Sequence, residues 1–252
     1  MFADYPHPEQ LPALRKLWKE AFGDEDAFLD QFFSTAYSPR RCRVVTADNQ
    51  VAGALYWLDC SWEGKPLAYF YAVATAQAFQ GRGICRFLLA DTHALLAEQG
   101  YAGVVLCPGN DGLFTMYAKL GYQTMSTIRE FTAEADGSHC PLTELSPEEY
   151  ARRRKALLPE GGILQEGESL SFLTTFSSLY AGTDCLLCAR RDGNTLFVPE
   201  ILGNTDRARE ILGYFGCETG TFRSPGPGKA FAMYHSLAKV AATPNYLGHA
   251  FD

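Results

Sequence analysis

The first third of the chain shows hydrophobic positions at helical spacing, followed by short runs at strand spacing. Apolar residues recur three or four positions apart over residues 9–22, which predicts an amphipathic helix ended by Gly23. A second helix is predicted before Pro39, with Asp24 as its expected N-terminal cap. Runs rich in β-branched and aromatic residues then predict an antiparallel meander of three strands, at 43–47, 51–60 and 67–75.

Longer elements follow the meander. A helix is predicted from the glycine-rich turn at 80–85 to about Gln99. The wholly apolar run 102–107 predicts a central strand that is covered on both faces. A further helical stripe ends at Gly121, and residues 122–134 are typical of a strand.

A polar stretch at 135–142, with Gly, Ser and Pro, indicates a boundary between two domains. We expect a first domain over residues 1–135, a second, smaller α+β domain over 141–238, and a C-terminal tail over 239–252. The elements predicted beyond the boundary are helices at 147–157 and 168–180, a hairpin at 185–189 and 195–202, a helix near 208–215, and strands at 218–223 and 230–237. Their order resembles that of the first half, but no sequence repeat supports a duplication.

Composition narrows the classes of function. The chain has 252 residues, with 22 basic and 29 acidic side chains and a formal net charge of −7, which argues against nucleic acid as a partner. The start of the chain lacks the pattern of a signal peptide, and no run approaches the roughly 18 apolar residues needed to span a membrane. We therefore expect a cytoplasmic protein whose eight cysteines are reduced. The lone pair Cys185 and Cys188 and the dispersed histidines predict no metal site.

The segment 73–85 carries the clearest chemical signal. A strand ends, the chain turns through Gly81 and Gly83, and a helix begins. Backbone N–H groups at a helix N-terminus lack intrahelical partners and attract anions, and glycines let that backbone approach a phosphate. Arg82 and Gln80 add donors, so the segment predicts a pyrophosphate cradle. The glycines alone equally suit a turn without a ligand, because short glycine patterns recur by chance.

Two motifs give this segment a context. Gln80-x-x-Gly83-x-Cys85 resembles motif A of the GNAT acyltransferases, although Cys85 stands where Gly or Ala is usual. Asn110 and residues 117–122 are similar to motif B of the same family, N-x(6)-Y-x-K-x-G-[FY]. The resemblance covers roughly residues 5–134, and two linked motifs at family-like spacing are more specific than either alone. We expect binding to survive at Cys85, because a helix N-terminus needs only its N–H groups.

The resemblance implies a mixed α/β fold of the GNAT acyl-CoA N-acyltransferase type, with a second, GNAT-like α+β domain that is a degenerate copy if it is a copy at all. It implies acetyl-CoA as cosubstrate, without a metal. The backbone at Val73 and Thr75 would pair with the pantetheine amides, Asn110 would contact the pantetheine arm, and the amides of the turn would hold the pyrophosphate. The residues expected to bind acetyl-CoA are Val73, Thr75, Gln80, Gly81, Arg82, Gly83, Ile84, Cys85 and Asn110.

The implied activity is transfer of an acetyl group to a primary amine of a small molecule or peptide, by direct attack in a ternary complex. Tyr117 would donate a proton to the departing thiolate, since the pKa of a phenol, about 10, is close to that of an aliphatic thiol. By spacing alone Tyr117 is typical of a core aromatic. A non-catalytic acyl-CoA sensor or scaffold, and an interaction protein without a CoA site, remain alternatives.

The general base and the acceptor stay open. Candidate bases are Asp59, Glu63 and the acidic run 24–26, each with an ordinary surface role as the alternative. The end of the chain, 245–252, is unusually apolar, so we expect it to dock. Resemblance to a tandem acyltransferase branch, the aminoglycoside-acetylating survival-factor type, implies that the Asp252 α-carboxylate reaches the active site.

The sequence pattern also predicts where several charged and aromatic side chains lie. The basic run 152–155 is expected to be a solvated helix face. Aromatic residues of the first two helices are expected mostly in the core, and the resemblance implies that these helices border the acceptor groove. Tyr56, Trp57 and Tyr69 are further candidates for its wall.

Overall fold

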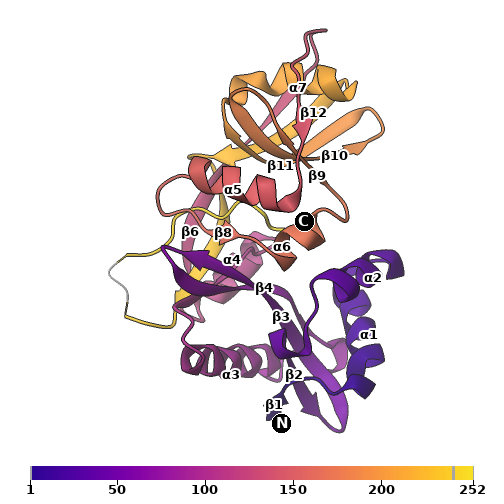
Figure 1. The fold of residues 1–252 in the computed structure, drawn as a ribbon. Helices are drawn as coiled ribbons and strands as arrows, with labels where there is room; N and C mark the ends of the chain where they lie inside the picture. Colours follow the sequence, from indigo (N-terminus) through magenta and orange to yellow (C-terminus); the bar gives the residue numbers. More distant parts are fainter. Residues whose placement is uncertain (1, 240–241, 252) are drawn as a thin grey trace.

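The computed structural model describes residues 2–239 and 242–251. One mixed sheet runs through the molecule, with helices on both of its faces (Figure 1), which confirms the mixed α/β class. In spatial order its strands are β1 (Phe2–Asp4), β2 (Cys42–Ala47), β3 (Gln50–Trp62), β4 (Lys65–Thr75), β5 (Gly103–Leu106), β13 (Lys229–Ser236), β6 (Gln123–Glu134), β12 (Thr219–Pro225), β11 (Thr195–Gly203), β10 (Cys185–Asp192), β9 (Ser178–Ala181) and β7 (Thr143–Glu144), while β8 (Leu164–Gln165) pairs with β3. The α-helices are α1 (Leu11–Phe22), α2 (Asp26–Thr35), α3 (Ile84–Glu98), α4 (Asp111–Ala118), α5 (Pro147–Leu157), α6 (Glu168–Leu173) and α7 (Ala208–Phe215).

Strands distant in sequence complete the sheet. β13, near the end of the chain, lies between β5 and β6 and is antiparallel to both. β6 pairs on its other edge with β12, where Phe131 faces Phe222. The sheet is therefore continuous across residues 135–141, where the sequence predicts a domain boundary. The division into domains at 1–135 and 141–238 stays a prediction.

Side-chain alternation along β3 lets one strand serve two cores. Tyr56 and Leu58 point to the face covered by α1, α2 and α6, whereas Leu55 and Trp57 point to the face covered by α3. Successive side chains of a strand point to opposite faces, so a run of apolar residues buries both. This arrangement places α1 and α2 on one side of the β3–β4 pair and α3 on the other.

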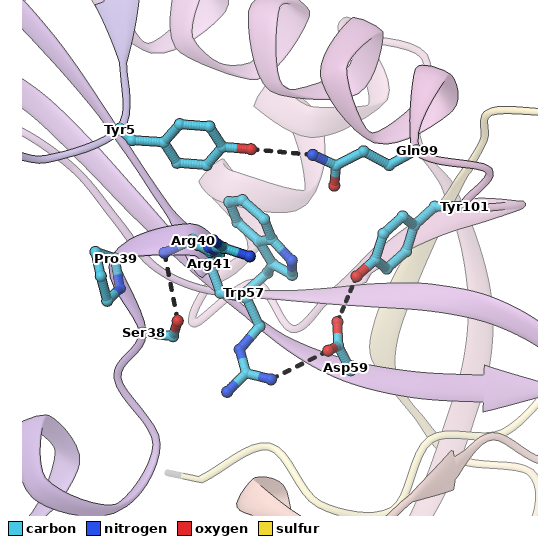
Figure 2. A pocket seen from close by; sticks show the side chains of 9 residues that line it. All are labelled: Tyr5, Ser38, Pro39, Arg40, Arg41, Trp57, Asp59, Gln99 and Tyr101. Carbon is cyan, nitrogen blue, oxygen red and sulfur yellow. Dashed lines mark hydrogen bonds and ion pairs between the residues drawn. The ribbon is translucent and has the colours of Figure 1, made fainter.

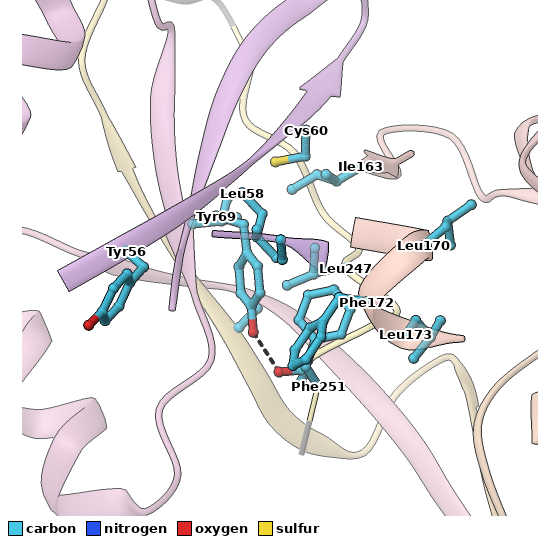
Figure 3. Packing of buried hydrophobic residues seen from close by; sticks show 14 of the residues in the cluster. Tyr56, Leu58, Cys60, Tyr69, Ile163, Leu170, Phe172, Leu173, Leu247 and Phe251 are labelled. Atoms are coloured by element: carbon cyan, nitrogen blue, oxygen red, sulfur yellow. Dashed lines mark hydrogen bonds between the residues drawn. The ribbon is translucent and has the colours of Figure 1, made fainter. Parts of the chain in front are cut away.

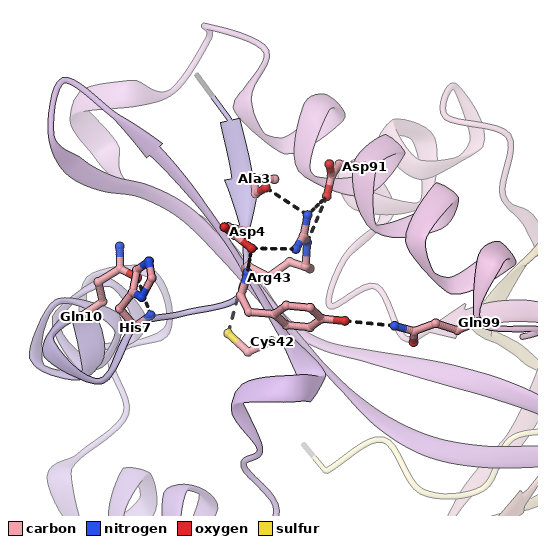
Figure 4. A network of polar contacts seen from close by, with 9 residues as sticks. Ala3, Asp4, His7, Gln10, Cys42, Arg43, Asp91 and Gln99 are labelled. Carbon is pink, nitrogen blue, oxygen red and sulfur yellow. Dashed lines mark hydrogen bonds and ion pairs between the residues drawn. The ribbon is translucent and has the colours of Figure 1, made fainter.

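The edge strand β1, which the sequence pattern did not indicate, is held by a buried arginine (Figure 4). The guanidinium of Arg43, on β2, donates hydrogen bonds from Nη2 to the Ala3 carbonyl at 3.0 Å and from Nε to Asp91 Oδ2 on α3 at 3.0 Å. A buried guanidinium needs an opposite charge and acceptors for its N–H groups. Asp91 supplies the charge and one of the acceptors. Arg43 thus connects β1, β2 and α3.

Two sequence predictions fail locally. The helix expected over 168–180 ends at Leu173, because the hydroxyls of Thr174 and Thr175 bond back to carbonyls of the preceding turn and β9 then pairs with β10. Asp24 does not cap α2. Its Oδ2 accepts a hydrogen bond from Trp18 Nε1 at 2.8 Å instead.

Candidate functional site

The sheet opens between β4 and β5. These parallel strands pair only from Leu67 to Tyr69, and beyond Tyr69 this edge of β4 has no partner strand in the described chain. On the other edge, the Ala76 N–H donates to the Ala52 carbonyl at 3.0 Å. Because backbone groups alternate sides along a strand, the N–H and C=O of Val73 and Thr75 point to the open edge.

A bulge in β4 lies beside the opening. Tyr71 faces Tyr56 and Ala74 faces Ala54, so two residues of β4, Ala72 and Val73, oppose a single residue of β3. Ala72 has a φ of 48°, a conformation that a residue with a Cβ rarely adopts. Nothing in the sequence indicates this, since no glycine or asparagine marks the position. Strained backbone of this kind is typical of functional sites.

The glycine-rich turn has the geometry of an anion cradle. Gly81 and Gly83 have φ values of 74° and 79°, and Gly83 is the N-cap of α3. The amides of residues 81–85 form no hydrogen bond with any residue in the described part of the chain. Arg82 is exposed, with its guanidinium 5.1 Å from the centre of the Phe79 ring. The turn therefore presents backbone donors to solvent beside one exposed cation, whose Nη1 lies 3.9 Å from Asp48 Oδ2.

Two other predicted binding residues have partners of their own. Gln80 Nε2 lies 3.5 Å from the Thr75 carbonyl, so this side chain turns back to β4. Asn110 is the N-cap of α4, and its Oδ1 accepts a hydrogen bond from the Leu113 N–H at 3.0 Å. The cap uses only the side-chain oxygen, so the side-chain nitrogen of Asn110 is available to a ligand.

A cleft of about 650 Å³ runs along the open edge of β4. Val73, Asn110 and Tyr117 line it, whereas Thr75 and residues 80–85 do not. Its walls come from several regions of the fold and are formed by Trp18, Ala21, Phe22, Asp24, Phe28, Tyr69, Phe70, Tyr71, Ala72, Val73, Leu106, Cys107, Pro108, Gly109, Asn110, Leu113, Tyr117, Phe176, Arg190, Ala250 and Phe251. Helices α1 and α2 do border this cleft, and Tyr69 lines it, while Tyr56 and Trp57 do not.

Tyr117 is a buried phenol at this cleft. Burial raises its pKa above the ordinary value of a tyrosine, and the neighbouring Cys85 adds to the effect. The expected match to the pKa of a thiol is therefore wrong for this environment. The phenol keeps its proton at neutral pH and can donate it. Ile84, at the start of α3, belongs to the same buried cluster as Tyr117.

The candidate bases lie in different parts of the structure. Asp24 lines the cleft. Asp59 lies in a different pocket (Figure 2), where it accepts hydrogen bonds from the Tyr101 hydroxyl at 2.6 Å and from Arg41 Nη1 at 3.1 Å. Glu63 is in the exposed β3–β4 turn, 3.5 Å from Lys65. Neither Asp59 nor Glu63 is positioned to act at the cleft.

The C-terminal tail forms part of the wall (Figure 3). The Tyr69 hydroxyl donates to the Ala250 carbonyl at 2.7 Å, and the Phe251 ring lies 5.6 Å from those of Tyr69 and Phe172. Gln165 holds the His249 backbone with two hydrogen bonds, of 2.7 and 3.1 Å. The tail is thus fixed to β4, α6 and β8. Asp252 and its α-carboxylate lie outside the described residues.

A buried ionic cluster, which we call the Glu200 cluster, holds the C-terminal tail in place. Glu200, on β11, accepts hydrogen bonds from Arg154 Nε at 2.7 Å, Arg154 Nη2 at 2.9 Å, the Tyr150 hydroxyl at 3.0 Å and the Tyr246 hydroxyl at 2.9 Å. His249 completes the cluster, with Nε2 3.3 Å from the carboxylate. The expectation that the run 152–155 is solvated is wrong for Arg154, whose side chain is 1% exposed.

Acid is expected to weaken this anchor. Burial lowers the pKa of His249 to about 4, although the Glu200 carboxylate acts in the opposite direction. An unfolded histidine takes up a proton near pH 6.5, so the unfolded state gains protons first as the pH falls. We expect His249 to contribute roughly 3 kcal/mol to the fall in the free energy of unfolding between pH 6.5 and 4, measured by urea unfolding across this range.

The matched control for this prediction is His249→Gln, which does not titrate and should flatten this part of the profile. His93, whose pKa burial also lowers to about 4, titrates in both proteins and therefore cancels in the comparison. Equal slopes in the two proteins would contradict the prediction.

Other features bear on cofactors and membranes. Across residues 2–239 and 242–251, no three His, Cys, Asp or Glu side chains gather as a metal site requires. None of the helices in these two ranges is long and apolar enough to cross a membrane. None of the eight cysteines, all of which are described, is in a disulfide, and six of them are buried.

Comparison with known proteins gives two kinds of match. Residues 5–125 match the family model described as an acetyltransferase (GNAT) domain. No curated protein sequence matches the chain. Among solved structures, a GCN5-related N-acetyltransferase from Kribbella flavida is 16% identical with a TM-score of 0.70, over 92% of this chain and 70% of that one.

Two further solved structures show the same extent of similarity. A GCN5-related N-acetyltransferase from Anabaena variabilis is 17% identical with a TM-score of 0.71, over 94% of this chain and 73% of that one. Eis1 from Mycobacterium abscessus is 12% identical with a TM-score of 0.70, over 94% of this chain and 74% of that one. At these identities the matches show a shared fold that extends well beyond residue 125.

Proposed function

Because residues 5–125 belong to the GNAT acetyltransferase family, we propose that this protein transfers an acetyl group from acetyl-CoA to a primary amine. The observation that carries the proposal is the set of unpartnered amides at residues 81–85 beside the open edge of β4. These donors suit the diphosphate of coenzyme A, and the edge at Val73 and Thr75 suits the amides of pantetheine, which would add to it like a strand.

The chemical step needs few groups from the chain. The amine nitrogen forms a bond to the acetyl carbon, the carbon–sulfur bond breaks, and the Tyr117 phenol gives its proton to the departing thiolate. The proton that the nitrogen loses on becoming an amide restores the phenol. A backbone N–H at the β4 bulge, near Ala72 and Val73, would hold the carbonyl oxygen as it gains negative charge. A free amine is required, so a base must first remove the ammonium proton. Among the described candidate bases, Asp24 is the one that lines the cleft.

The cradle can be tested with a matched pair of substitutions. Gly81 has a positive φ, and no atom lies within 4 Å of the Cβ that a side chain would add. Asp and Asn both tolerate this conformation, but Asp adds a negative charge beside the diphosphate. We expect Gly81→Asp to weaken acetyl-CoA binding about 10-fold or more in calorimetry, and Gly81→Asn to change it less than about 3-fold.

Release of free thiol with a panel of amines then separates the possible functions. Turnover by the wild-type protein supports the transferase. Heat of acetyl-CoA binding without turnover of any amine favours a sensor or scaffold. No heat at sub-millimolar acetyl-CoA, or equal binding by the Asp and Asn variants, contradicts the cradle.

We further propose that the protein works in the cytoplasm, as the eight free thiols suggest. The net charge of −7 agrees with an amine, cationic before it reacts, as the acceptor.

A further inference from the structure

Aromatic rings dominate the part of the cleft that lies away from the motif residues. Four of them contact one another in series: Phe22 is 5.9 Å from Trp18, Trp18 is 5.6 Å from Tyr71, and Tyr71 is 5.8 Å from Phe251. The rings of Phe28 and Phe176, 6.0 Å apart, also line the cleft. These residues come from α1, α2, β4, the segment after α6 and the tail, so the fold gathers them at this place.

Phe22 is not required by the core. It is the last residue of α1, and its side chain is 47% exposed although it lines the cleft. Covering such a ring with an apolar group releases water and is favourable, by about 25 cal/mol per Å² of apolar surface. An acceptor with an apolar body would cover it, whereas a highly hydrated one would not.

The described residues give the cleft little negative charge. Among its described lining residues the charged side chains are Asp24 and Arg190. Asp24 is held in place by Trp18, whose Nε1 donates to Oδ2 at 2.8 Å. One carboxylate beside aromatic faces suits one ammonium group, through an ion pair and cation–π contact. Further ammonium groups would lose their water without a counter-charge, which is costly.

We propose that the acceptor is a monoamine on an apolar body, such as an arylalkylamine or an alkylamine, with its ammonium group attracted by Asp24 and its body against Phe22 and the neighbouring rings. This rests on the proposed acetyl transfer and adds the acceptor class. Polyamines and amino sugars, which carry several ammonium groups, are poor acceptors by this argument.

The test uses acceptors that differ by one group. Hexylamine and 1,5-diaminopentane have the same chain length, but the second has an ammonium group where the first has a methyl group. We expect kcat/KM, from thiol release, to be at least 10-fold higher for hexylamine, and 2-phenylethylamine to exceed spermidine and kanamycin by a similar factor. Equal or better turnover of the polycations overturns the inference while the transferase function stands. No turnover of any amine overturns both.

Two variants and one control test whether Phe22 and Asp24 determine the acceptor preference. Phe22→Ala is expected to raise KM for 2-phenylethylamine about 5- to 10-fold with little change in kcat. Leu157→Ala removes an apolar side chain of similar exposure, 45%, away from the cleft and should leave KM unchanged. Asp24→Asn is expected to raise KM for monoamines and, because Asp24 is also the candidate base, to lower kcat, while acetyl-CoA affinity in calorimetry stays as in wild type. Unchanged KM in both Phe22→Ala and Asp24→Asn also overturns the inference.

Discussion

Exchange of Glu200 for glutamine is expected to lower the free energy of unfolding by about 3 to 5 kcal/mol. Burial alone would raise the pKa of Glu200, but the Arg154 guanidinium outweighs it and holds the pKa at about 2. The carboxylate is therefore charged in the folded protein at neutral pH. Glutamine keeps its shape but leaves the buried Arg154 without this counter-ion. Urea denaturation followed by tryptophan fluorescence measures the loss.

Two controls show that the effect comes from burial of a charge. Glu149 also pairs with arginines, Arg152 and Arg153, but on the surface of α5, so Glu149→Gln should cost less than about 1 kcal/mol. The double variant Arg154→Met with Glu200→Gln removes both charges but keeps an acceptor for the Tyr150 and Tyr246 hydroxyls, and it should recover most of the stability lost in Glu200→Gln. A loss below about 1 kcal/mol for Glu200→Gln would be incompatible with the cluster as an anchor.

The Glu200 cluster also bears on the cleft. Tyr246 bonds to Glu200, and a Cβ at Gly248 would lie within 1.7 Å of Glu200 Oε1, so the tail backbone passes directly over the carboxylate. Three residues further on, Phe251 forms part of the cleft wall. A loosened cluster would therefore free the ring that completes the acceptor side. Residues of the second half of the chain thus help to build a site whose motifs all lie in the first half.

Local patterns predicted most of the elements correctly because their signals are local. Amphipathic spacing follows from the burial of one helix face or strand face. The glycines of the turn indicate the start of the helix at Ile84. The cradle was predicted in the same way, since it depends on consecutive backbone amides. Asn110 and Tyr117 were proposed from the family resemblance, because spacing alone favours a core role for Tyr117.

Features that depend on distant partners could not be predicted. Arg154 differs from its basic neighbours only because it faces a carboxylate 46 residues away in sequence, and the position of β13 depends on strands more than 90 residues before it. The positive φ of Ala72 arises from pairing of β4 with β3 and has no sequence signal. The contribution of Phe251 to the cleft likewise appears only when the tail is folded onto β4 and α6.

Exchange of Tyr117 for phenylalanine is expected to lower kcat about 100-fold or more, since removal of a general acid costs 10²- to 10⁴-fold. The ring remains, so packing at the cleft should be kept and acetyl-CoA affinity should stay within about 2-fold in calorimetry. Because burial raises the pKa of Tyr117, its proton is retained as the pH rises, and kcat should show no decline from loss of this proton between pH 8 and 10.

Tyr122→Phe is the matched control for this prediction. The Tyr122 ring lies 5.4 Å from that of Tyr117 and is equally buried, but its hydroxyl is bonded to His93 Nε2 at 2.7 Å and does not line the cleft. Loss of this hydroxyl should reduce stability by about 1 kcal/mol and leave kcat within about 3-fold of wild type. If Tyr117→Phe behaves like Tyr122→Phe, Tyr117 is a packing residue, and the proton for the thiolate must come from elsewhere. A fall in kcat restricted to Tyr117→Phe, with unchanged acetyl-CoA binding, assigns the proton to this phenol.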